Sequence, residues 1–151
     1  MDTFFLYQAF VEAKKALNIN EVPVGAIIVK NNKIISKGFN QCINLIDPTA
    51  HAEIIALKKA TKKINNYRLN NCYLYVTIEP CLMCIGALIN ARIKRIVIGS
   101  IINKHYKEKY NNVEIIENKN HDLKIKCSSI IKNFFKKKRE INKSYIYSGV
   151  K

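Results

Sequence analysis

Four residues of this chain stand out as candidates for chemistry, and they lie at the start of two apolar runs. His51 and Glu53 lie in the stretch TAHAEIIAL, and Cys81 and Cys84 lie in EPCLMC. Burying an imidazole or a carboxylate without a partner costs on the order of several kcal/mol. We therefore expect each of these groups to have a ligand or a substrate as its partner.

The spacing of the four residues predicts a shared centre where two helices begin. Residues at i and i+2 of a regular helix point apart, so His51 and Glu53 can serve one centre only at a helix N-terminus, where the entering chain is not yet helical. Cys81 and Cys84, at i and i+3, share one face, and the free N–H groups of a helix N-terminus favour thiolates. One histidine and two cysteines suit tetrahedral zinc with its fourth position left to water, which is typical of a catalytic site. Glu53 is then the carboxylate that removes a proton from this water.

Less specific explanations exist for each half of this constellation. A histidine at a helix start is usually structural, and an isolated Cys-x-x-Cys pair is often two core residues or half of a structural zinc site. A structural site needs a fourth ligand, and no other cysteine or histidine repeats the ligand spacing. We expect the remaining candidates to be packing or surface residues: Cys42, Cys72, Cys127, His105 and His121.

The hydrophobic pattern along the chain predicts an α/β architecture. Residues 6–17 show the spacing of an amphipathic helix that ends near Asn18, and two β-rich runs joined by Asn31 and Asn32 predict a hairpin. Asp47 and Pro48 precede a helix that starts apolar and ends rich in lysine. The runs CYLYVTI, CLMCIGALINA and RIKRIVIGSII predict a strand, a helix and a strand, which implies a parallel crossover. NNVEIIE predicts a fifth strand. We expect a last helix over about 121–139 and a tail over 140–151. The buried stripe of this helix should consist of Leu123, Cys127, Ile130, Ile131 and Phe134.

Length and composition suit one domain over residues 1–151. The sequence contains no apolar run long enough to span a bilayer and no basic leader, so we expect a soluble, cytoplasmic protein. The five cysteines are expected to be reduced thiols or ligands. The net charge of +15 suggests a polyanionic partner such as nucleic acid, although abundant lysine, isoleucine and asparagine also indicate AT-rich coding.

The motif H-x-E followed by P-C-x-x-C resembles the signature of the zinc-dependent nucleoside and nucleobase deaminases. Together with EVPVGAIIV, DPTAHAEIIAL, NYRL, LYVTIEPCLMC and FFKKKR, the chain is similar to the bacterial tRNA-specific adenosine deaminases from its first helix to its last. The resemblance implies a three-layer α/β/α cytidine-deaminase-like fold with a five-stranded mixed sheet. It also implies a homodimer with one zinc per subunit that converts adenosine to inosine at the first anticodon position of an arginine tRNA.

The resemblance also assigns roles to individual residues. It makes Glu53 the proton shuttle of a zinc bound by His51, Cys81 and Cys84. Asn40, otherwise a turn residue at the end of the hairpin, matches the asparagine that binds the target base. The backbone N–H of Ala52 matches a second donor to the purine, and Val22 and Ile78 match apolar walls of the pocket, although each of the three could be plain core.

The chain departs from the family pattern after RIVIG. The family usually has a polar stretch with an acidic residue there, whereas this chain has SIINKHYKEKYNN, which is shorter and more basic. The way in which the nucleotides flanking the target are bound is therefore open. A charge run at a helix end is more often a solvated face, but these basic residues can pair with phosphates, and the expected contacts are Lys104, Lys107, Lys109, Lys136, Lys137, Lys138 and Arg139.

Two other functions fit parts of the sequence. The zinc motif alone also suits a deaminase of a free base or nucleotide, such as cytosine, guanine or the riboflavin precursor. A non-catalytic tRNA-binding subunit of the same fold is another alternative, but such subunits typically lack the glutamate that this chain retains at Glu53.

Overall fold

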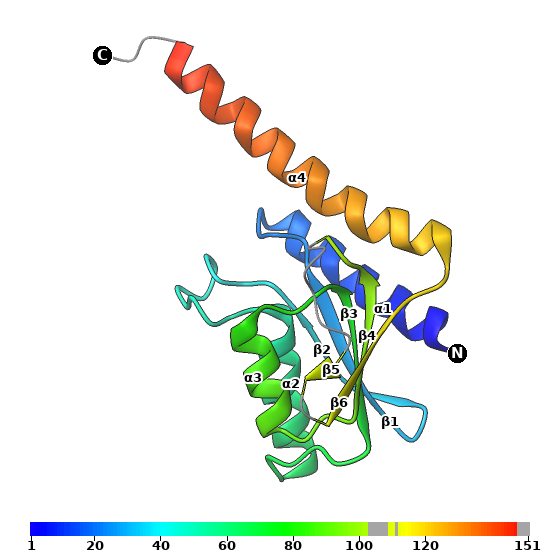
Figure 1. Ribbon diagram of the computed structural model, residues 1–151. Coiled ribbons are helices and arrows are strands. Elements are labelled where there is room, and N and C mark those ends of the chain that lie inside the picture. The colour runs from blue at the N-terminus through cyan, green and yellow to red at the C-terminus, as the bar shows by residue number, and fades with distance from the viewer. Residues whose placement is uncertain (103–108, 111, 148–151) are drawn as a thin grey trace.

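The computed structural model of the protein describes residues 1–102, 109–110 and 112–147, and it combines four helices with a mixed sheet in that part of the chain (Figure 1). None of the helices in these residues has the length and apolar character needed to span a bilayer. In chain order the elements are α1 (Asp2–Asn18), β1 (Gly25–Lys30), β2 (Lys33–Phe39), α2 (Ala52–Ile64), β3 (Cys72–Ile78), α3 (Leu82–Asn90), β4 (Arg95–Ser100), β5 (Lys109–Tyr110), β6 (Val113–Glu117) and α4 (His121–Tyr147).

The sheet has the strand order β2-β1-β3-β4-β6-β5. Strand β1 pairs antiparallel with both β2 and β3, whereas β3 pairs parallel with β4 and β4 with β6. The expected mixed sheet of five main strands is confirmed, and the two-residue strand β5 extends its edge. The parallel pair β3 and β4 encloses α3 as a crossover, which brings the end of β3 directly to Cys81.

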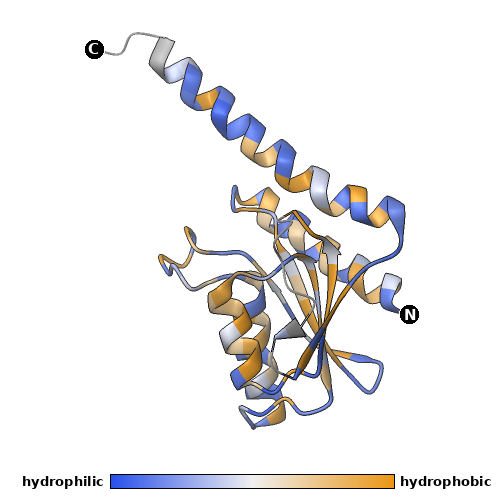
Figure 2. Cartoon of the chain, in the orientation of Figure 1, coloured by the Kyte–Doolittle hydropathy of each residue, from blue (hydrophilic) through white to orange (hydrophobic). Residues whose placement is uncertain are grey.

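Two helices cover each face of the sheet, as the three-layer prediction requires. Helices α1 and α4 contact one face, and α2 contacts the other with α3 beside it (Figure 1). The side chains of β1 alternate between the two cores: Ala26 and Ile28 face the α2 and α3 side, and Ile27 and Val29 face α1. Because both faces are covered, the central strands are mostly hydrophobic (Figure 2).

The hairpin and the first helix agree with the sequence prediction. Helix α1 ends at Asn18, and Asn31 and Asn32 join β1 to β2 with φ of 49° and 58°. Asparagine tolerates this left-handed conformation better than most residues. The polar turn therefore fixes the register in which β1 and β2 pair.

Helix α4 is longer than the sequence pattern indicated. The tail expected from residue 140 is instead helical through Tyr147. No glycine or proline interrupts residues 121–147, so the backbone can continue as a helix after its apolar stripe has ended. Every residue from Phe135 to Tyr145 is exposed, and Figure 1 shows this part of α4 projecting beyond the body of the protein.

The close packing of α1 on β1 leads to a stability prediction at Gly25. A Cβ added there would overlap the backbone of α1 at the Ala9 carbonyl and the Ala13 amide. Overpacking against backbone that cannot move by itself typically costs about 1–3 kcal/mol or more. We expect Gly25→Ala to lose at least this much free energy of unfolding, measured by urea denaturation.

The matched control is Gly86→Ala. Gly86 lies on the exposed side of α3, where an added Cβ meets nothing within 4 Å. Alanine is the better helix former, so this variant should be as stable as the wild type or more stable by up to about 1 kcal/mol. A Gly25→Ala protein with wild-type stability would show that α1 does not need this close approach.

Candidate active site

His51 and Cys81 occupy equivalent positions, each being the residue immediately before a helix. His51 is the N-cap of α2 and Cys81 the N-cap of α3, and both have extended backbones, with ψ of 154° and 169°. Cys84 lies in the first turn of α3. His51 therefore has an extended backbone and Glu53 a helical one, so the side chains of these two residues can approach one centre.

A tight turn delivers the chain to the start of α2. The backbone amide and the hydroxyl of Thr49 both donate to Asp47 Oδ1, at 2.8 and 2.7 Å. The His51 amide then donates to the Thr49 carbonyl at 2.7 Å. These local bonds, formed by an Asp-Pro-Thr sequence typical of turns, set the direction in which His51 enters the site.

The three candidate ligands converge on one point. His51 Nδ1 lies 3.6 Å from Cys81 Sγ and 3.6 Å from Cys84 Sγ, and the three ligand atoms are all within 4.8 Å of one another. Zinc bonds of about 2.1 Å to nitrogen and about 2.3 Å to sulfur, at a tetrahedral angle, place N and S roughly 3.6 Å apart. The cluster thus matches the donor set and the spacing of a tetrahedral zinc centre.

The burial of the ligands differs across the cluster. Cys84 is buried, His51 is half-buried and Cys81 is exposed. A metal held by these residues would be anchored from the protein side and accessible from the other. This arrangement suits a site that keeps one position for a small ligand.

Glu53 is buried beside the cluster and is 3 % exposed. Burial raises the pKa of Glu53 to about 7, although the hydrogen bonds from its own backbone amide and from Cys84 oppose that rise. In the described part of the chain no salt bridge involves this carboxylate. A carboxyl group with such a pKa can both accept and donate a proton near neutral pH, as a general acid-base catalyst must.

Cys84 corrects one expectation from the sequence. Its position in the first turn of α3 was expected to favour the thiolate, but burial, Glu53 and Cys81 raise its pKa above the usual range. The largest cause is removal of the sulfur from water, which disfavours the charged form of the thiol. Two thiols and a carboxyl group share this small space, and a bound cation is what would stabilise their ionised forms together.

Asn40 lies just before a residue that is bound to the segment leading to His51, and it offers an unused side chain. Its backbone amide donates to the Val24 carbonyl at 3.1 Å, and the next amide, of Gln41, donates to the Ala50 carbonyl at 3.0 Å. The side chain is 8 % exposed and makes no hydrogen bond to any residue that the structure describes. A buried carboxamide without a protein partner is available to a ligand.

The other predicted pocket residues, Val22, Ile78 and Ala52, are all at least partly buried. Val22 and Ile78 are partly buried and pack against the core on the α2 and α3 side. Ala52 is fully buried as the first residue of α2, where a backbone N–H has no acceptor within the helix.

The predicted RNA contacts are only partly described. Lys104 and Lys107 lie outside the described residues, and for Lys109 only the backbone position in β5 is given. Lys136, Lys137, Lys138 and Arg139 are exposed on the projecting part of α4.

The residues set aside as ligands stay apart from the cluster. Cys72 and Cys127 are buried in the core, Cys42 is half-buried, and His121 is exposed at the start of α4. His105 lies outside the described residues.

Sequence reasoning gave no role to Glu79. Its Oε2 accepts the Ile102 amide at 2.9 Å and so links the Cys81 turn to the segment after β4. The acidic residue directly before Pro80 was the available signal.

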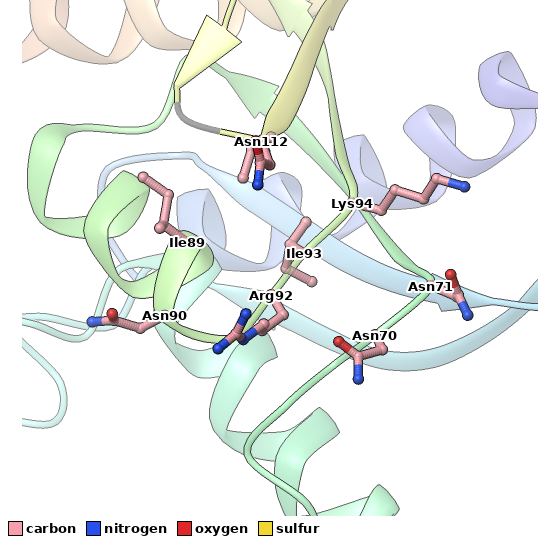
Figure 3. A pocket seen from close by; sticks show the side chains of 9 residues that line it. Asn70, Asn71, Ile89, Asn90, Arg92, Ile93, Lys94 and Asn112 are labelled. Atoms are coloured by element: carbon pink, nitrogen blue, oxygen red, sulfur yellow. The ribbon is translucent and has the colours of Figure 1, made fainter.

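A separate hollow of about 610 Å³ lies at the other end of α3, around Asn90 and Arg92. Figure 3 shows Lys94 pointing away from Arg92, so the two cations do not converge on one ligand position. The hollow contains none of the predicted site residues. This hollow is therefore separate from the cluster at the N-terminal ends of α2 and α3.

Comparison with known proteins agrees with this arrangement. Residues 2–139 match the MafB19-like deaminase family. The chain is 41 % identical to a tRNA-specific adenosine deaminase of Buchnera aphidicola subsp. Baizongia pistaciae, over 99 % of this chain and 97 % of the relative. It is 44 % identical to the enzyme of that name from Haemophilus influenzae, over 87 % and 81 %.

Solved structures show the same relationship. A structure from a study of A-to-I editing by tRNA:A34 deaminases is 31 % identical, with a TM-score of 0.76 over 85 % of this chain and 99 % of that one. A guanine deaminase from Bacillus subtilis is 40 % identical, with a TM-score of 0.63 over 66 % of this chain and 64 % of that one. The sequence matches, extending over nearly the whole chain, agree with the fold and with the His-Cys-Cys cluster. The chain therefore belongs to the deaminases and, among them, to the family of the tRNA-specific adenosine deaminases.

Proposed function

We propose that the protein converts adenosine to inosine at the first anticodon position of a tRNA, by hydrolytic deamination at a site that holds one zinc ion per chain. The observation that carries the proposal is the approach of His51 to both cysteines at 3.6 Å beside the buried Glu53. The names of the full-length relatives supply the substrate.

The zinc ligands in this proposal are His51, Cys81 and Cys84. Their spacing and their nitrogen and sulfur donors fit zinc, as described above. Bound there, zinc would act as a Lewis acid that makes a water molecule nucleophilic towards C6 of adenine.

Glu53 performs the proton transfers. Its carboxylate takes a proton from the attacking water and delivers it to ring nitrogen N1 of adenine. It then carries the remaining proton of that water, now on the C6 hydroxyl group, to the amino group, which leaves as ammonia while the C6 carbonyl of inosine forms. Burial at 3 % exposure keeps bulk water from competing for these protons, and a pKa raised towards 7 suits a group that alternates between acid and base.

The base is held by groups around the cluster. The free carboxamide of Asn40 and the first-turn N–H of Ala52 provide hydrogen bonds to the ring, and Val22 and Ile78 provide apolar walls. The nucleotide must leave the stack of the anticodon loop to reach this position, as in other enzymes that modify a base.

The RNA backbone is bound by basic residues, among which α4 offers an ordered row. Lys132, Lys136, Arg139 and Lys143 are spaced at i, i+4, i+7 and i+11, so they share one face of the helix. The row extends over about 16 Å of helix, enough to meet more than one phosphate. All four residues are exposed, and Figure 2 shows that hydrophilic residues predominate on the projecting part of α4.

This row predicts the salt dependence of tRNA binding. Each phosphate contact contributes roughly 0.7 to 0.9 to the slope of log K against log salt. The double variant Lys136→Gln/Arg139→Gln should therefore lower the slope by about 1 to 2 and weaken binding at physiological salt. The measurement is a salt titration of tRNA affinity.

The matched control removes the same charge elsewhere. Lys62→Gln/Lys63→Gln changes two lysines in the last turn of α2, at the end of that helix away from His51. It should leave the slope close to that of the wild type. Equal effects of the two double variants would mean that only the overall charge of +15 attracts the RNA.

We further propose that the protein acts as a homodimer in the cytoplasm, on an arginine tRNA. Large apolar side chains are exposed beside the site: Ile46 is 93 % exposed on the loop before His51, and Leu82 is 78 % exposed directly after Cys81. A second copy that covers them would remove this apolar surface from water. Sedimentation equilibrium at micromolar concentration should show a dimer.

The function is tested by offering the purified protein different substrates. A tRNA with an unmodified anticodon adenosine is incubated in parallel with free adenosine, cytidine and guanine, and inosine and ammonia are measured. We expect product from the tRNA alone. Because a guanine deaminase is 40 % identical over part of the chain, release of ammonia from a free base alone would favour the alternative and overturn the proposal.

A further inference from the structure

Glu21 is a buried carboxylate that the chemistry described above does not use. It follows α1 and the left-handed residue Asn20, and only 1 % of it is exposed. In the described part of the chain it forms no salt bridge. Its Oε1 instead accepts the backbone amide of Asn44 at 2.7 Å. A charge hidden from water at such a cost needs a reason.

The partner of Glu21 belongs to the loop that connects two parts of the site. Residues 41–47 run from Asn40, the predicted base-binding residue, towards His51. The loop is compact, since the amide of Leu45 donates to the Gln41 carbonyl at 2.9 Å and that of Asp47 to the Cys42 carbonyl at 3.0 Å. Because the loop is compact, a hydrogen bond at its middle also restrains the positions of its two ends.

The loop is attached to the rest of the protein near its start, at its middle and at its end, where Asp47 Oδ2 lies 4.0 Å from Lys58 Nζ. The Asn40 amide is bound by the Val24 carbonyl, and the Gln41 amide by the Ala50 carbonyl. Both bonds lie at the start of the loop, and the bond from Asn44 to Glu21 is the attachment at its middle. Glu21 and Val24 precede β1 and Asn40 follows β2, so Glu21 continues the contact between these strands beyond the end of their ladder.

We propose that Glu21 is a positioning residue for deamination, which holds the Asn40–Asn44 segment so that the Asn40 carboxamide stays directed at the base. The inference rests on the proposed function. Glu21 does not touch the substrate in this assignment and acts through Asn44 and Asn40. A carboxylate is well suited to the task because a bond from N–H to a charged acceptor is stronger than one to a neutral acceptor.

Two substitutions separate the hydrogen bond from the packing. Glu21→Met keeps the length of the side chain but has no acceptor for the Asn44 amide, whereas Glu21→Gln keeps an amide oxygen there. Misplacement of a positioning group by about 1 Å can cost on the order of 10²-fold in rate. We expect Glu21→Met to lower the single-turnover rate at saturating tRNA by roughly 10- to 100-fold and Glu21→Gln to recover most of it. Zinc content and tRNA affinity should stay near wild type in both.

The matched control is a second buried carboxylate. Glu12 is 2 % exposed on α1 and pairs with Lys15 at 2.7 Å, and among the residues that the structure describes it makes no hydrogen bond or ion pair to the loop. Glu12→Met should lose stability but keep the wild-type rate at a temperature where the protein is folded. A rate loss in Glu12→Met as large as that in Glu21→Met would mean that general destabilisation, and not positioning, lowers the rate.

A double-mutant cycle with Asn40→Ala completes the test. If Glu21 acts through Asn40, then Glu21→Met should cost little in a protein that already lacks the Asn40 side chain, and the two losses will not multiply. Full multiplication of the two losses, an unchanged rate in Glu21→Met, or a Gln variant as slow as the Met variant at equal stability would each overturn the inference. These outcomes are distinguishable from failure of the proposed function, in which the wild-type protein itself makes no inosine from tRNA.

Discussion

Replacing Glu53 by glutamine is expected to lower the single-turnover rate of inosine formation by about 10²- to 10⁴-fold or more, with zinc content and tRNA affinity near wild type. Glutamine keeps the shape of the side chain and can still form hydrogen bonds, but it cannot accept a proton from the attacking water. The loss should reach the upper end of the range because the same carboxyl group is required for more than one proton transfer. Because Glu53 is not a metal ligand, its substitution should leave the ion in place.

The measurement combines rapid quenching at saturating tRNA with metal analysis and a binding titration on the same sample. Glu12→Gln is the control, because Glu12 is another buried carboxylate but lies on α1. It should react at close to the wild-type rate. If Glu53→Gln kept more than about a tenth of the wild-type rate, a loss far below that expected for general acid-base catalysis, Glu53 would not be the proton shuttle.

His51→Ala should fail in a different way, by losing the metal together with the activity. Only Cys81 and Cys84 remain as ligands in this variant, and a site with two protein ligands holds zinc far less tightly than one with three. The thermal stability should fall as well, because metal that binds only the folded state contributes to folding. Chelation of the wild-type protein should reproduce both effects, and added zinc should reverse them.

Metal analysis after dialysis against a chelator tests this expectation directly. The wild-type protein should hold one zinc per chain, and His51→Ala should hold much less. His121→Ala is the control, since His121 is exposed at the start of α4 and should leave the zinc content unchanged. Stoichiometric zinc in His51→Ala, or in a protein with both Cys81→Ala and Cys84→Ala, would contradict the assigned ligand set.

Helix α4 has a buried apolar part followed by an exposed basic part. In the predicted apolar stripe, Leu123, Cys127, Ile131 and Phe134 are buried, whereas Ile130 is only half-buried. Beyond Phe134 the helix continues for three more turns without a buried residue in the described part, and its stability there cannot come from packing. A polyanion along the row of Lys132, Lys136, Arg139 and Lys143 would relieve the repulsion between these charges.

The sequence by itself was sufficient for everything that depends on local spacing. The helical period located α1 and the buried stripe of α4, the paired asparagines located the hairpin turn, and the motifs HAE and EPCLMC identified the candidate ligands before any fold was known. These features are local because a period of 3.6 residues, a turn or an i and i+3 pair is defined within a few residues of the chain. The wider resemblance supplied the mixed sheet and the three layers, which the structure confirms.

Other properties depend on residues that are distant in the sequence, and only the tertiary structure decided them. The approach of His51 to Cys81 and Cys84 is set by the sheet that carries α2 and α3, and burial by that same packing reverses the thiolate preference expected for Cys84. The hydrogen bond from Asn44 to Glu21 joins residues on either side of the β1–β2 hairpin, and no pattern in the sequence indicates it. The apolar pattern did not predict the length of α4. Its end was placed where the apolar period stops, but a helix that leaves the core can continue without that period. Local patterns determine which groups are available, whereas the ionisation and the hydrogen bonding of each group depend on what the rest of the fold places around it.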